Sequence, residues 1–168
     1  MRVLLRSLAC AALLISSTAL AQDRPAGAVS AHVFATTEAD VGGGVSGDIW
    51  YPIEWFRVGG FFGVGVIPSE VDTQNRVLMP LGVSLAAEVV GDAVGVSFRA
   101  RGGLWGGATQ EAKLTVGGLL GLGAHLLVVL GPGVSFTVGM DVFGLFGAGD
   151  TVVLAPALGL TWTPVTPP

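Results

Sequence analysis

The chain alternates between apolar and small polar residues along most of its length, and this pattern limits what it can fold into. In residues 94–101, valine, phenylalanine and alanine occupy one set of alternate positions, while glycine, serine, Arg99 and Arg101 occupy the other. A period of two is that of a β-strand, whereas a helix repeats about every 3.6 residues. The same alternation marks eight expected strands: 29–36, 41–50, 56–66, 81–89, 94–101, 114–126, 134–142 and 152–162.

Residues 114–131 (LTVGGLLGLGAHLLVVLG) also allow a second interpretation. Taken alone, this apolar run is long enough for a transmembrane helix. Its glycines and its place in the alternating series favour a strand instead. The helix remains the alternative, and with it a polytopic inner-membrane protein.

The apolar face of the expected strands is too extensive for a water-soluble protein. Charged residues make up 12% of the chain, whereas a soluble surface carries about 25–35% of them. The pattern fits the opposite orientation, with the apolar face toward lipid and the small polar face toward a narrow lumen. Only a closed barrel pairs every backbone group of strands that cross a bilayer. The sequence therefore predicts an all-β, eight-stranded antiparallel up-and-down transmembrane β-barrel.

The first residues have the pattern of a secretory signal peptide. Arg2 and Arg6 precede an apolar stretch that ends in Ala19-Leu20-Ala21, a small-x-small cleavage site. Cleavage there would also remove Cys10, the only cysteine, and with it any disulfide or thiolate chemistry. An uncleaved anchor is the alternative. The expected organisation is a signal peptide (1–21), a periplasmic lead (22–28), the barrel (29–163) and a C-terminal tail (164–168).

Charged residues inside the expected strands fall on the lumen side of the alternation. An arginine that faces lipid at the bilayer midplane costs about 2–4 kcal/mol, and an unpaired charge in the lumen is also unfavourable. We therefore expect a lumenal network of arginines and carboxylates. Its members are Arg57, Arg99, Arg101, Asp48, Glu88 and Asp141, and His32 and His125 are further candidates.

Taken together, the signal peptide, the eight alternating segments and the inward charges resemble the small bacterial outer-membrane β-barrel proteins of the OmpA and OmpX type. The resemblance implies location in the outer membrane, after export, with both chain ends in the periplasm. Periplasmic turns would then fall at 51–54, 91–93 and 130–133, and outward loops at 36–40, 68–76, 108–112 and 147–151. An interfacial aromatic girdle is expected near the periplasmic side: Trp50, Tyr51, Trp55, Phe56 and Trp162.

Three features depart from that family. The chain ends TWTPVTPP rather than on an aromatic residue, and the outward loops are short. Pro80 and Pro156 fall within expected strands, where a closed barrel has no free edge to accommodate a proline. A local bulge is one way to accommodate each proline.

The sequence carries no recognisable catalytic motif. Ser30 lies near His32, but no G-x-S-x-G motif or oxyanion loop accompanies the pair. No metal or cofactor site is expected, and the net charge of −4 argues against nucleic-acid binding. We expect a non-enzymatic outer-membrane protein with a structural or interaction role and a lumen filled by side chains. It would be a monomer that contacts membrane lipids, its protein partner unspecified. The alternatives are a narrow pore for a small solute and a soluble, lipocalin-like ligand-binding barrel.

Overall fold

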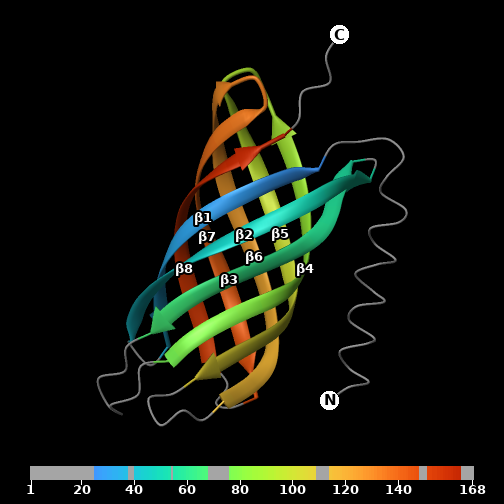
Figure 1. The fold of residues 1–168 in the computed structure, drawn as a ribbon. Coiled ribbons are helices and arrows are strands. Elements are labelled where there is room, and N and C mark those ends of the chain that lie inside the picture. The colour runs from blue at the N-terminus through green and yellow to red at the C-terminus, as the bar shows by residue number, and fades with distance from the viewer. Residues whose placement is uncertain are drawn as a thin grey trace.

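The structure, a computed structural model, describes residues 25–37, 40–53, 55–67, 76–108, 114–147 and 151–163. Within these residues eight antiparallel strands form one closed barrel, in which each strand pairs with its neighbours in the chain and β8 pairs with β1 (Figure 1). The predicted eight-stranded up-and-down barrel is confirmed. Its strands are β1 (Ala26–Thr36), β2 (Val41–Ile53), β3 (Phe56–Ile67), β4 (Arg76–Val90), β5 (Val94–Ala108), β6 (Leu114–Gly131), β7 (Val134–Phe146) and β8 (Thr151–Trp162).

The alternation along each strand separates the outer surface from the lumen. On β5, Phe98 is 58% exposed on the outside, whereas its neighbour Arg99 is 2% exposed inside. Large exposed apolar side chains occur on all eight strands, because successive side chains of a strand point to opposite faces. The outside of the barrel is therefore apolar, as a lipid-facing surface requires.

Strand ends differ from the sequence prediction more than strand positions do. β1 begins at Ala26, inside the expected periplasmic lead, and β2 continues through the expected turn at 51–54 as far as Ile53. β6 continues to Gly131, and β4 begins at Arg76. Polar clusters indicate where a chain meets water, but hydrogen bonding to a neighbouring strand can extend past that point. The predicted signal peptide and C-terminal tail lie outside the described residues.

Residues 114–131 form strand β6, so the alternative interpretation as a transmembrane helix is wrong. The long glycine-containing run pairs with β5 and β7 along its length. Nowhere in the described ranges is there a helix of sufficient length and hydropathy to cross a membrane.

Pro80 and Pro156 both lie inside strands, and neither causes a bulge. The β3–β4 ladder pairs Phe62 with Leu81 and Gly65 with Leu78 in one register, with no pairs between them. The β1–β8 ladder has the same kind of gap beside Pro156. Proline has no N–H to donate, so each ladder is interrupted on one side while the register continues. Neither proline is therefore accommodated by a bulge.

The turn between β6 and β7 depends on one glycine. Gly133 follows Pro132 in this turn and has a φ of +74°, a region in which an L-residue pays about 1–2 kcal/mol. We expect Gly133→Val to lower the free energy of unfolding by about that amount. Gly131→Val is a matched control. Gly131 lies two positions earlier, and a Cβ added there would meet no other atom within 4 Å apart from its chain neighbours. Urea unfolding in detergent micelles would compare the two, and equal losses would contradict the strain at Gly133.

Candidate functional site in the barrel lumen

Arg101 is the centre of the lumenal charge network. Its Nε and Nη2 donate to the two carboxylate oxygens of Asp48, at 3.1 and 2.6 Å, and its Nη1 donates to Asp141 Oδ2 at 3.2 Å. These side chains come from β5, β2 and β7, so the contacts cross the lumen rather than follow a ladder. All three are almost completely buried. A two-pronged contact of this kind is the strong form of an arginine–carboxylate pair.

Both histidines contact the same carboxylate. His125 Nε2 lies 3.1 Å from Asp141 Oδ1, and His32 Nδ1 lies 3.7 Å from Asp141 Oδ2. Glycines leave the room that this arrangement needs: a Cβ at Gly123 would collide with the Asp141 carboxylate, and one at Gly139 would collide with the His125 ring. Asp141 is thus hydrogen-bonded to His125 and Arg101, with His32 farther away.

A second ion pair lies nearer the end of the barrel at which β1 begins and β8 ends. Arg57 Nη1 donates to Glu88 Oε2 at 2.6 Å, and Ser97 Oγ donates to the other carboxylate oxygen at 3.4 Å. The Arg57 side chain is 18% exposed, more than any other charged group in these ion pairs. This pair is separate from the Arg101 cluster in its contacts.

Arg99 lies in the lumen, but it does not pair with a carboxylate of the described residues as the expected network required. Within the described part of the chain it makes no ion pair; its Nη2 donates to Thr161 Oγ1 at 3.2 Å instead. Its guanidinium carbon lies 5.1 Å from the centre of the Trp50 ring, a cation–π distance. Its Nε and Nη1 are buried without a hydrogen-bond partner. Arg99 therefore contributes its charge to the lumen without touching a carboxylate.

Trp50 does not belong to the aromatic girdle, so that placement is wrong. Its side chain is completely buried in the lumen, where Nε1 donates to Ser84 Oγ at 2.9 Å. Trp50 is an even-numbered residue of β2, like Asp48, and shares its inward direction. Trp55 is 76% exposed and packs edge-on against Phe56, while Trp162 faces outward and covers Gly27. Tyr51 is half-buried at the same end of β2.

The half of the lumen nearer the end at which β1 ends and β8 begins is apolar, an arrangement that was not predicted from the sequence. Phe61, Trp105, Leu119, Leu145 and Val153 form a buried cluster, against which Phe34, Leu78 and Phe143 pack. Strand parity could have identified these residues, since each occupies an inward position of its strand. The lumen is therefore divided into a charged half and an apolar half.

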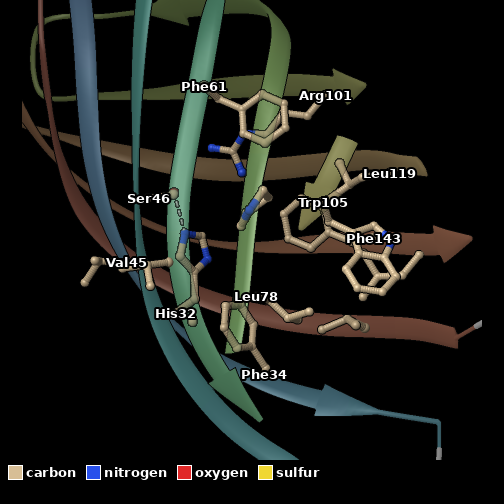
Figure 2. A pocket seen from close by; sticks show the side chains of 15 residues that line it. His32, Phe34, Val45, Ser46, Phe61, Leu78, Arg101, Trp105, Leu119 and Phe143 are labelled. Atoms are coloured by element: carbon tan, nitrogen blue, oxygen red, sulfur yellow. Dashed lines mark hydrogen bonds between the residues drawn. The ribbon is translucent and has the colours of Figure 1, made fainter. Parts of the chain in front are cut away.

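A small cavity of about 50 Å³ lies at the boundary between these halves. Figure 2 shows His32 bonded to Ser46 on one side of it, with Trp105 and Phe143 on the opposite side. Arg101 also contributes to the lining, and most of the other lining side chains are apolar. The cavity is thus bordered by the network at one edge and by the apolar cluster elsewhere.

The lumen brings together a serine, a histidine and an aspartate, but not the pair considered from the sequence. Ser46 Oγ lies 2.8 Å from His32 Nε2, while Ser30 Oγ has no hydrogen-bond partner. The 3.7 Å from His32 Nδ1 to Asp141 is too long for the hydrogen bond that orients a catalytic histidine. Within the described ranges no group of histidine and carboxylate side chains could hold a metal ion.

Comparison with known proteins identifies the fold. No protein-family model matches the sequence, and no curated protein is similar to it. Solved structures that are similar include the neisserial surface protein NspA (13% identity, TM-score 0.68), the outer membrane enzyme PagL (15%, 0.57) and the attachment invasion locus protein Ail of Yersinia pestis (12%, 0.54). The matches cover 83%, 82% and 84% of this chain and 96%, 99% and 98% of those chains. In fold, the chain is an eight-stranded antiparallel β-barrel similar to those of small outer-membrane proteins.

Proposed function

We propose that this protein is a non-enzymatic, monomeric barrel of the bacterial outer membrane, with a structural or interaction role and a lumen closed to solutes. The observation that carries the proposal is the filling of the lumen. Arg101 joins Asp48 to Asp141 across one half, and the apolar cluster around Trp105 fills the other. Eight strands leave an interior that side chains can fill.

Membrane location is supported by the apolar outer surface. Exposed large apolar side chains occur on all eight strands, and a water-soluble barrel would expose polar residues there. The soluble, lipocalin-like alternative predicts that the exported protein remains in solution without detergent. We expect it instead to partition with outer-membrane vesicles and to migrate differently on a gel before and after boiling.

Closure of the lumen can be tested by conductance. The purified protein, inserted into planar bilayers, should give no ion current above background, because the Arg101 cluster and the apolar cluster block the path. A general porin inserted in parallel is the positive control. Steady single-channel steps from this protein would support the narrow-pore alternative and overturn the closed lumen.

The non-enzymatic part has its own test at Ser46. An acyl-transfer enzyme needs a serine activated by an oriented histidine and a donor group for the oxyanion. His32 contacts Ser46, but its other nitrogen has no hydrogen bond. A fluorophosphonate probe should therefore leave Ser46 unlabelled, with a Ser46→Ala variant as background. Labelling lost in that variant would show a reactive serine and contradict the proposal.

A further inference from the structure

The cavity between the two halves of the lumen lies directly behind a break in the barrel wall. Pro80 lines this cavity from β4. The β3–β4 ladder has no pairs between Phe62–Leu81 and Gly65–Leu78, although Pro80 still pairs with Trp105 on its other side. In a bilayer the wall is held closed by backbone hydrogen bonds. The seam between β3 and β4 is therefore a weak part of the wall in front of the cavity, and Pro80 places this gap at the cavity itself.

Both sides of this seam are apolar. Outside it, Phe62, Met79 and Leu81 are among the exposed apolar residues that face lipid. Inside it, Gly63 and Gly65 have no side chain to obstruct the lumen, and Phe34, Leu78 and Trp105 line the space beyond. On this side of the barrel, the cavity is thus separated from the lipid-facing surface by an incompletely bonded strand pair.

The chemistry of the cavity selects an apolar occupant. A buried water needs two to four polar partners. The polar lining groups are confined to one edge, where Ser46 bonds to His32 and Arg101 bonds to carboxylates, and among the described residues only His32 Nδ1 is left without a hydrogen bond there. An apolar cavity of about 150 Å³ accepts a benzene molecule. A cavity of about 50 Å³ has room for the end of a hydrocarbon chain.

We propose that this cavity accepts the end of an acyl chain from a bilayer lipid, which enters through the β3–β4 seam at Pro80. The inference rests on the proposed location in a membrane. The chain would contact Trp105, and the polar edge at His32 and Ser46 would limit how far it reaches toward the charged half. The occupant comes through the wall because the barrel surface in front of the seam contacts the hydrocarbon of the bilayer.

Tryptophan quenching by brominated lipid tests the proposal directly. The protein is reconstituted into phosphatidylcholine vesicles with or without brominated acyl chains, in variants that keep a single tryptophan. Trp162 faces lipid and should be quenched. Trp105 faces the lumen, and we expect it to be quenched to a similar extent because a chain end reaches it. The Trp50→Phe change needed for these variants could prevent folding. In that case, the difference in quenching between wild type and Trp105→Phe reports on Trp105, and the difference between wild type and Trp162→Phe reports on Trp162.

Two further variants test whether the chain enters at the β3–β4 seam and whether it occupies the cavity. Pro80→Val restores an N–H donor at the seam and should reduce quenching of Trp105 while leaving Trp162 unchanged. Pro156→Val is the matched control, because Pro156 lies beside the other ladder gap and faces outward, away from the cavity. Val153→Phe fills the cavity from within and should also protect Trp105.

The outcomes separate this inference from the proposed function. Quenching of Trp162 without quenching of Trp105 would overturn the acyl-chain site and leave the membrane barrel intact. If neither Trp105 nor Trp162 is quenched, both the acyl-chain site and the membrane barrel are overturned. Quenching of Trp105 that is unchanged by Pro80→Val would overturn the entrance at the seam.

Discussion

Replacement of Arg101 with methionine should destabilise the barrel much more than the same replacement at Arg99. Arg101→Met leaves the Asp48 and Asp141 carboxylates buried without the arginine that contacts both. Breaking a buried pair by removing one partner costs about 3–5 kcal/mol. Urea unfolding of the protein in detergent, followed by tryptophan fluorescence, should show a midpoint lowered accordingly.

Arg99→Met is the matched control, on the same strand and in the same lumen. Arg99 makes no ion pair within the described residues and has two unpartnered nitrogens, so its removal also removes an uncompensated burial cost. A triple variant that adds Asp48→Asn and Asp141→Asn to Arg101→Met should recover part of the lost stability, since no unpaired carboxylate remains. Equal losses at Arg99 and Arg101 would show that total lumenal charge matters and specific contacts do not.

Trp50→Ala should produce the second large loss of stability. The indole is completely buried, donates to Ser84 and lies beneath the Arg99 guanidinium. Truncation of a buried tryptophan to alanine typically costs about 3–5 kcal/mol, and here it also removes the cation–π contact. Thermal unfolding in detergent, followed by the loss of heat-modifiable gel migration, would measure the change.

Trp55→Ala provides the comparison, because the Trp55 side chain is 76% exposed in the turn after β2. We expect it to change stability little in micelles, since it packs only against Phe56 among the described aromatic rings. If Trp55→Ala were the more damaging of the two, Trp50 would belong at the membrane interface as the sequence first indicated.

The alternation of residues predicted the barrel well because side-chain direction in a strand follows from position alone. It placed Arg99, Arg101, Asp48 and Asp141 inside, and the structure has each of them buried there. The same rule, applied to Trp50, would have placed that residue beside Asp48 in the lumen. The error arose because Trp50 was grouped with the aromatic residues that follow it in the sequence.

Partner choice inside the lumen could not be predicted in the same way. Alternation predicts whether a side chain points inward or outward. It does not predict the position of that side chain along the barrel axis, which depends on how far each strand is staggered relative to its neighbours. Arg101 reaches Asp48 on β2 and Asp141 on β7, whereas Arg99, two residues away, reaches Thr161 on β8 and the Trp50 ring. The apolar cavity depends on the same stagger, because its lining comes from strands on several sides of the barrel.

The ladder joins each strand only to its immediate neighbours, but the Arg101 contacts join strands that are not adjacent. A partly assembled sheet, still open between β1 and β8, holds β2, β5 and β7 too far apart for these contacts to form together. Such an intermediate would leave at least one of these three buried charges without its native partner. We therefore expect the lumenal salt bridges to favour the closed cylinder over the open sheet.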